Sequence, residues 1–240
     1  MSIRKEKIRI CSVCWNTNKI MCFTSMYISE SDLDGNSAWT FYFNWVNRCD
    51  KCWYCNTEID KSIPWIKELV KSEKYVKQLN NKKYIDWVNK LLCGVMVNKL
   101  TWHYIKCWFM NLICSWMYLE ENLNNEYVKY FKKEAISYFE KDIKKIFLSW
   151  NALVYIDTLR QLWEFSKAKE FYQKYKDDII KKYESDIIDM IKFDMKLISE
   201  KDSDIYTSDW VKKSEIKEII KEYVEEKNIS FFERIKGLFK

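Results

Sequence analysis

The chain contains very little glycine and proline, with 3 and 1 of these residues in a length of 240. Proteins on average contain about 7% glycine and 5% proline. All-β folds need such residues at their frequent turns, so their scarcity favours long helices with few tight turns. The hydrophobic content of 48% is enough to bury a substantial core. We expect an α+β protein that is mainly α.

The sequence also has little long apolar sequence of the two kinds that direct a chain to export or into a membrane. The start, MSIRKEKIRICSVC, lacks the apolar segment of a secretory signal. The most apolar stretch, residues 104–119, contains Lys106 and is shorter than the roughly 20 residues of a membrane span. We therefore expect a cytoplasmic protein with no membrane span. In that reducing compartment the nine cysteines would be thiols or metal ligands rather than disulfides.

Basic residues are concentrated in one part of the chain. Residues 1–60 carry seven basic and seven acidic residues, whereas residues 61–115 carry ten and three. Phosphate groups could bind such a basic segment, with a steep dependence on salt. Solvated lysines on helix faces explain the same pattern, so nucleic acid is only an alternative partner. The lysines include Lys61, Lys67, Lys71, Lys74, Lys77, Lys82, Lys83 and Lys90.

Two CxxC pairs are the strongest chemical signal in the sequence, and 34 residues separate them. A CxxC turn presents two thiolates, and two such turns complete a tetrahedral structural zinc site. The sequence therefore predicts one structural zinc ion, with Cys55 as an alternative fourth ligand. The predicted ligands are Cys11, Cys14, Cys49 and Cys52.

Other interpretations of the cysteines remain open. They could be buried or merely local thiols, because cysteine is among the most buried residue types. A redox dithiol would need a βαβ context that this segment lacks. The cysteines outside the CxxC pairs stand among apolar residues and are expected in the core. These are Cys22, Cys93, Cys107 and Cys114.

The chain changes character after residue 60. Residues 20–29 and 39–49 are rich in aromatic and β-branched residues, as strands are, so residues 1–60 are predicted to form a zinc-ribbon module. Helical spacing follows from Ser62, a predicted cap, with Pro64 in the first turn. We expect a helical domain over 61–229 and an amphipathic tail over 230–240. Helices are predicted over about 62–79, 84–98, 101–120, 126–146, 150–162, 166–183, 186–199 and 212–227.

The N-terminal pattern resembles a group of uncharacterised bacterial proteins, a domain of unknown function. Their pattern runs CPxCG, PDLDxRP and WVQECPxCGY, followed by helices that resemble tetratricopeptide repeats. The segment TWHYIKCW at 101–108 is similar to their helix AWxYLRAAW. The resemblance implies a zinc ribbon and a helical body, and it implies no reaction. The matching residues are Cys11, Cys14, Asp32, Leu33, Asp34, Trp45, Val46, Cys49, Cys52 and Tyr54.

Residues 158–176 resemble the turn and second helix of a tetratricopeptide repeat, of the form YYxxGDYxxAxxYYxKA. In that comparison Ala168 is the small residue where two helices approach closely, and Phe165 and Tyr172 fill the groove. Residues 132–141 show the same small-then-aromatic order. An ordinary amphipathic helical hairpin is the alternative.

Three tryptophans, Trp15, Trp53 and Trp163, stand where the related patterns have glycine. Glycine is favoured there because the backbone often adopts positive φ, which costs a bulky residue about 1–2 kcal/mol. We hypothesise that such tryptophans are UGA codons that the source organism reads as glycine. If they are tryptophans, both CxxC turns are strained.

No complete catalytic constellation is evident, so we expect no enzyme activity. His103 and Cys107 could meet on one helix face, but no third residue is evident to orient the imidazole. The pair Asp32 and Asp34 is expected to order its loop by accepting hydrogen bonds from backbone N–H groups.

These features together predict a zinc-binding adaptor that binds a protein or peptide. Helical arrays expose surfaces that bind extended peptides or helices. The expected surface is a groove along the helices of 126–183, with Tyr138, Tyr155 and Tyr172 as candidate contacts. The tail over 230–240 is expected to dock on protein, with weak membrane contact as the alternative.

Overall fold

The computed structural model describes residues 3–25, 32–34, 36, 45–120, 123–145 and 150–208. This part of the chain confirms the mainly helical α+β prediction. The α-helices are α1 (Ile66–Lys71), α2 (Glu73–Leu79), α3 (Asp86–Leu100), α4 (Tyr104–Glu120), α5 (Asn125–Phe139), α6 (Asn151–Gln161), α7 (Phe165–Lys182) and α8 (Ser185–Glu200). The strands are β1 (Ile3–Ile10), β2 (Thr17–Ser25), β3 (Asn47–Arg48) and β4 (Cys55–Asn56), and a 3-10 helix, η2, spans Glu140–Lys145. Among these described helices, none has the length and apolar character needed to cross a membrane.

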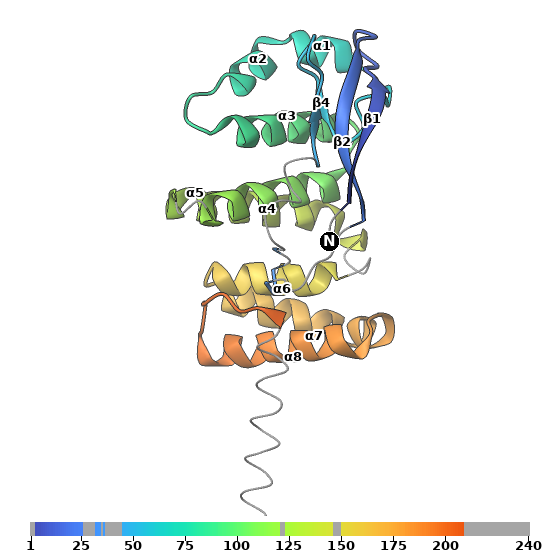
Figure 1. The fold of residues 1–240 in the computed structure, drawn as a ribbon. Coiled ribbons are helices and arrows are strands. Elements are labelled where there is room, and N and C mark those ends of the chain that lie inside the picture. The colour runs from blue at the N-terminus through green and yellow to red at the C-terminus, as the bar shows by residue number, and fades with distance from the viewer. Residues whose placement is uncertain are drawn as a thin grey trace, which may run out of the picture.

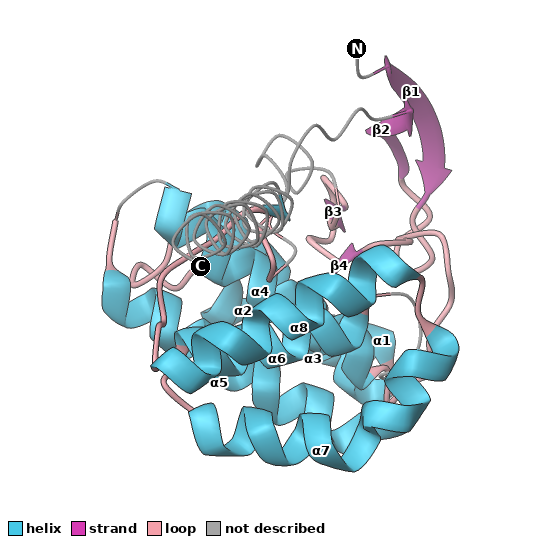
Figure 2. Ribbon diagram, turned by 90° about the horizontal axis from the view of Figure 1, so that it is seen from below, coloured by secondary structure: helices cyan, strands magenta, loops and turns pink. Residues whose placement is uncertain are grey.

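Consecutive helices lie side by side and form successive layers (Figure 1). Helix α2 packs on α3, α4 packs on both α3 and α5, and α8 contacts both α6 and α7. The strands lie at one end of the stack, next to α1 and α3, and β4 packs on α3 (Figures 1 and 2). Short connections at 101–103 and 162–164 link neighbouring helices, which is typical of helical hairpins.

One continuous core runs through the helices and the cysteine-rich region. The Phe139 ring of α5 stacks on Tyr155 of α6 at 4.3 Å, and Tyr155 meets Phe171 of α7 at 4.7 Å. The same core contains buried residues from the N-terminal module, among them Val46 and Tyr54. The module is therefore packed into the helical body, with no gap in the packing at residue 60.

The β-strands differ from those expected. Strand β1, whose sequence IRKEKIRI is mostly charged, pairs antiparallel with β2, in register from Arg4 with Phe23 to Ile10 with Thr17. The second pair, β3 with β4, is antiparallel and very short. The two cysteine pairs thus lie in the turns of two hairpins. Residues 39–44 of the predicted second strand lie outside the described residues.

Several helix boundaries also differ. The first helix begins at Ile66 rather than Ser62, and Ser72 divides it into α1 and α2, because its hydroxyl accepts a hydrogen bond from the Tyr75 N–H at 3.3 Å. Helix α5 ends at Phe139, and a kink at Asp142, with φ of −135°, stops it from continuing to residue 146. The predicted helix over 212–227 and the tail over 230–240 lie outside the described residues.

Candidate metal centre

The first CxxC turn connects β1 to β2 through a closed backbone loop. The N–H group of Cys11 donates to the carbonyl of Asn16 at 2.9 Å, and the Trp15 N–H donates to the carbonyl of Cys11 at 2.9 Å. These two bonds fold the chain back on itself. Cys11 and Cys14 therefore project from one tight turn.

The second CxxC turn repeats this geometry between β3 and β4. The N–H group of Cys49 donates to Tyr54 O at 2.9 Å, and the Trp53 N–H donates to Cys49 O at 3.0 Å. Each bond spans the same number of residues as its counterpart in the first turn. The two turns are therefore equivalent elements, built from parts of the sequence that are far apart.

The four predicted ligands come together at one point, as the sequence predicted. Their sulfur atoms all lie within 4.8 Å of one another, with Cys11 3.6 Å from Cys52 and Cys14 3.5 Å from Cys49. A tetrahedral site with zinc–sulfur bonds near 2.3 Å places its sulfurs about 3.8 Å apart. The described cysteines form no disulfide. The donor set and its spacing therefore fit one tetrahedral metal ion.

Backbone N–H groups around the sulfurs favour bound thiolates. Burial raises the pKa of Cys49, but hydrogen bonds from the N–H groups of Cys52 and Lys51, with help from Cys14 and Cys11, outweigh it and lower the pKa to about 7. The pKa of Cys11 is raised by burial, while the N–H groups of Cys14 and Val13 oppose that shift. Such outer contacts orient ligands and tune metal affinity.

Other bonds hold the two turns against each other. The Ser12 N–H donates to the carbonyl of Ile59 at 2.9 Å, and the Asp50 N–H donates to Asn18 Oδ1 at 3.0 Å. Arg9 also forms an ion pair with Asp60. The four thiols are therefore positioned by the protein itself.

Cys55 is not part of this cluster. It is buried, its thiol donates to the carbonyl of Trp53 at 3.2 Å, and its N–H donates to the Tyr75 hydroxyl at 2.9 Å. The alternative assignment of Cys55 as a ligand is therefore wrong. Cys93, Cys107 and Cys114 are buried as predicted, and the side chain of Cys22 lies outside the described part.

The possible His103–Cys107 pair does not form. His103 is exposed, and its Nδ1 lies 2.6 Å from the Thr101 hydroxyl. Cys107 is buried, and its thiol donates to the Val95 carbonyl at 3.6 Å. The imidazole and the thiol therefore interact with different partners.

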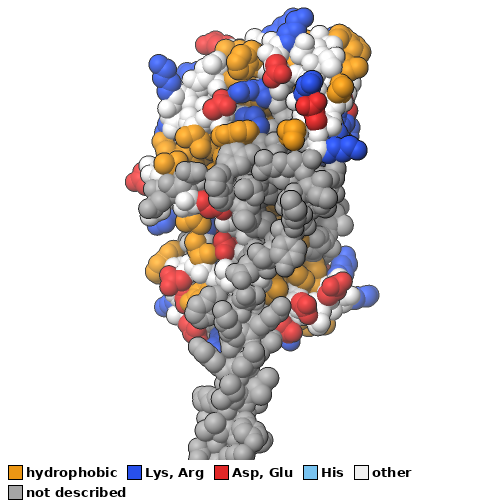
Figure 3. Space-filling model, in the orientation of Figure 1, with side chains coloured by type: hydrophobic (Ala, Val, Ile, Leu, Met, Phe, Trp, Pro, Cys, Tyr) orange, Lys and Arg blue, Asp and Glu red, His pale blue; other side chains and the backbone are white. Residues whose placement is uncertain are grey.

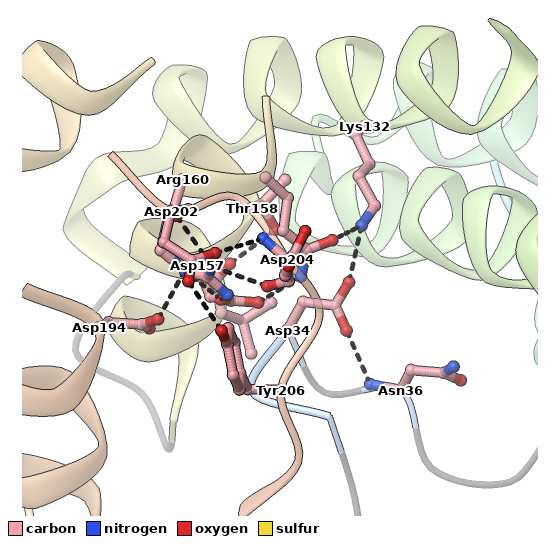
Figure 4. A network of polar contacts seen from close by, with 12 residues as sticks. Asp34, Asn36, Lys132, Asp157, Thr158, Arg160, Asp194, Asp202, Asp204 and Tyr206 are labelled. Atoms are coloured by element: carbon pink, nitrogen blue, oxygen red, sulfur yellow. Dashed lines mark hydrogen bonds and ion pairs between the residues drawn. The ribbon is translucent and has the colours of Figure 1, made fainter. Parts of the chain in front are cut away.

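Asp34 anchors its short segment to the helices through a buried ion pair (Figure 4). Its Oδ1 accepts the Asn36 N–H at 3.2 Å, as the loop-ordering prediction expects. Its Oδ2 lies 3.0 Å from Nζ of Lys132 in α5, and both side chains are almost completely buried. Lys132 also contacts Gln161 at the end of α6. Asp34 therefore has a structural partner that the sequence did not identify.

Arg160 of α6 is the centre of the same buried network (Figure 4). Its Nε donates to Asp157 and to Asp194 of α8, both at 3.0 Å. Its Nη1 donates to the carbonyls of Asp202 and Asp204 at 3.1 and 2.7 Å. The guanidinium group therefore fixes the segment that follows α8.

That segment also meets the N-terminal module directly. The Leu33 N–H donates to the Tyr206 carbonyl at 3.0 Å, and Asp32 forms an isolated β-bridge with Thr207. The network therefore joins residues 32–34 and 36, α5, α6, α8 and residues 202–207. Sequence reasoning missed it, although Lys132 lies at helical spacing from the buried residues Val128 and Ala135, which is a usable signal for a buried charge.

Asp194 and Asp32 hold their protons more tightly than exposed carboxyl groups do. Burial, with repulsion from Asp157, raises the pKa of Asp194 well above its usual range. Burial, with repulsion from Asp34, raises the pKa of Asp32 to about 6. The protonated form of Asp32 is therefore favoured in the folded state. The raised pKa of Asp32 therefore stabilises the folded state fully below about pH 4, and this stabilisation is lost as the pH rises through 6.

The variant Asp32→Asn should remove this pH dependence. At pH 8 it should be more stable than the parent by about 1–2 kcal/mol after allowance for solvent screening, because it removes a poorly solvated charge. At pH 4 the difference should vanish. Thermal unfolding at both pH values measures this, with exposed Asp178→Asn as the control. If Asp32→Asn changed the melting temperature equally at pH 4 and pH 8, the raised pKa of Asp32 would be contradicted.

Two CxxC hairpin turns that place four thiols at one point, on a mainly helical body, define a chain with a candidate four-cysteine metal centre. Comparisons with protein-family models, with curated proteins and with solved structures give no match. The resemblance to the bacterial group with repeat-like helices therefore stays a prediction.

Proposed function

We propose that this chain is a cytoplasmic adaptor, without catalytic activity, whose N-terminal module is held by one structural zinc ion. The arrangement of the four sulfurs carries the zinc assignment. Structural zinc sites use four protein ligands, whereas catalytic sites keep a position for water or substrate. In the described cluster four thiols supply as many ligands as a closed tetrahedral site needs.

Zinc is the ion that this donor set favours, with iron as the alternative. Soft thiolate ligands in a tetrahedron select zinc or iron–sulfur chemistry. Metal analysis of the purified chain should find one zinc per molecule. If the analysis found one iron per molecule instead, the four-cysteine metal site would be supported but the assignment of zinc would be rejected.

The layered helices support the adaptor role. Stacked helical hairpins present extended surfaces on which a peptide or a helix of a partner can lie. In the α6–α7 hairpin Ala168 is fully buried, and Phe165 and Tyr172 are partly buried against the core. Two of the three candidate tyrosines were wrongly chosen as partner contacts, because Tyr138 and Tyr155 are buried in the core. Tyr172 is partly exposed and keeps that candidate role.

Capture of binding proteins tests the proposal with a matched pair of variants. The full-length chain should retain a protein or peptide partner, and Tyr172→Ala should weaken the retention at least tenfold without loss of zinc. Gln173→Ala, the exposed neighbour, should have no effect. If both variants retained the partner equally well, the groove along the helices of 126–183 would be rejected as the binding surface.

Nucleic-acid binding is the alternative, and the lysines of residues 61–90 are the observation that favours it. Seven of the eight lysines named above are exposed, and Lys90 is buried. In the face seen in Figure 3, however, basic and acidic side chains are interspersed. Gel-shift measurements at rising salt separate the two functions, since phosphate binding weakens steeply with salt.

A further inference from the structure

Positive backbone φ is concentrated at tryptophan. Six described residues other than glycine have this conformation, and five of them are tryptophans with φ between 56° and 66°. The left-handed region is uncommon for any side chain and is an outlier for a bulky one. The five are Trp15, Trp53, Trp65, Trp102 and Trp163, and the sixth residue is Lys201.

Each of the five occupies a turn that ordinarily requires glycine. Trp15 and Trp53 follow the second cysteine of the two CxxC turns, where their N–H groups bond to Cys11 and Cys49. The chain must reverse there within a few residues. Positive φ at this point makes that reversal possible, and glycine adopts it without steric cost.

Trp65 lies in a β-turn after the only proline of the chain. The Ile66 N–H donates to the carbonyl of Ile63 at 3.3 Å, with Pro64 and Trp65 at the two central positions. Trp65 has φ of 62° and ψ of 10°. A turn with proline first and positive φ second is type II, in which glycine is the usual second residue.

Trp102 and Trp163 end helices α3 and α6 in the same way. The Trp163 N–H donates to Arg160 O and the Glu164 N–H to Leu159 O, both at 2.9 Å. Trp102, with the N–H group of the following residue, makes the equivalent pair of bonds at the end of α3. This is the Schellman motif, whose left-handed position is most often glycine. Lys201 occupies the same position after α8, so one side chain is tolerated there.

The indole rings gain little that would offset this strain. The exposed fractions of the five side chains range from 49% to 75%. Their ring contacts are local, as between Trp102 and Tyr104 at 5.9 Å. By contrast, Trp108 and Trp116 are buried within helix α4. The described tryptophans therefore include one group that is packed in the core and another that is placed where glycine belongs.

The described glycine shows the opposite mismatch. Gly94 lies inside helix α3, where an added Cβ would come within 3.1 Å of Met110 and 3.5 Å of Val46. It serves close packing rather than a turn. Tryptophan thus occupies almost all of the described positions with positive φ. At about 1–2 kcal/mol each, the strain at these five positions sums to a value close to the free energy of unfolding of an ordinary domain.

We infer that residues 15, 53, 65, 102 and 163 are glycines in the protein as its host makes it, encoded by UGA codons that the host reads as glycine. The two metal-binding turns, one β-turn and two helix ends are then free of strain. The surface also loses five exposed indole rings. This inference does not depend on the proposed adaptor role.

The gene and the native protein test the inference directly. We expect UGA at the five codons and UGG at codons 108 and 116. Peptides of the protein from its own host should have the mass of glycine at the five positions. A UGG codon, or a peptide with the mass of tryptophan, overturns the assignment at that position.

Stability gives a second test that is independent of codons. A chain with all five Trp→Gly changes should melt about 10 °C higher than the tryptophan form. It should also keep its metal at lower free zinc concentrations. Trp108→Gly, the matched control in the core, should instead lower the melting temperature. A lower melting temperature for the fivefold variant would contradict the inference.

Discussion

Replacing Cys52 by serine should lower the zinc affinity of the chain by more than about 100-fold, because even the loss of outer-shell contacts costs 10–100-fold. Cys52 is one of four thiols at a single point, and its sulfur lies 3.6 Å from that of Cys11. A serine hydroxyl does not replace a thiolate as a ligand. We therefore expect zinc content to fall from one per chain towards none.

The same change should open the N-terminal module while the helical body remains folded. Each hairpin has only two strands, and isolated two-stranded hairpins are marginally stable. Hydrogen exchange should therefore increase over residues 3–25 and 45–60 and stay slow in α4–α6. The buried control Cys114→Ala removes a thiol outside the cluster and should keep full zinc content. Unchanged zinc in Cys52→Ser would reject the metal centre.

Replacing Arg160 by methionine should lower the free energy of unfolding by about 3–5 kcal/mol, the cost of breaking a buried ion pair. Arg160, Asp157 and Asp194 are completely buried. Without the guanidinium group, the carboxylate of Asp157 would be left without its cation in a site that water does not reach. Chemical denaturation measures the loss.

The second effect of this change should be local. Arg160 donates to the carbonyls of Asp202 and Asp204, so residues 202–207 should exchange their amide hydrogens faster in Arg160→Met. Adding Asp157→Asn should recover part of the lost stability, because it removes the unpaired charge.

Arg48→Met is the matched control for Arg160→Met. Arg48 pairs with Asp86 at 2.7 Å, but the two side chains are 28% and 62% exposed. Exposed pairs contribute about 0–1 kcal/mol. A similar loss of stability in the two arginine variants would show that burial is not the reason for the effect.

The metal ligands were predictable because their chemistry is local. Cys11 and Cys14, like Cys49 and Cys52, are close in sequence, and each pair fixes its own turn. Most helices were also predictable, because their apolar residues recur with the helical period. Strand β1 was not predictable, because its many charged residues are not typical of a strand and its hydrogen-bond partners lie in β2.

Residue types, their spacing and the scarcity of glycine and proline were enough to determine the mainly helical class and the four ligands. Only the tertiary structure decided which groups pair with the buried charges. Lys132 and Arg160 find their partners where α5, α6 and α8 meet residues 32–34 and 202–207. It also decided that Cys55 faces the core, because burial depends on which elements pack together, and no local pattern encodes that.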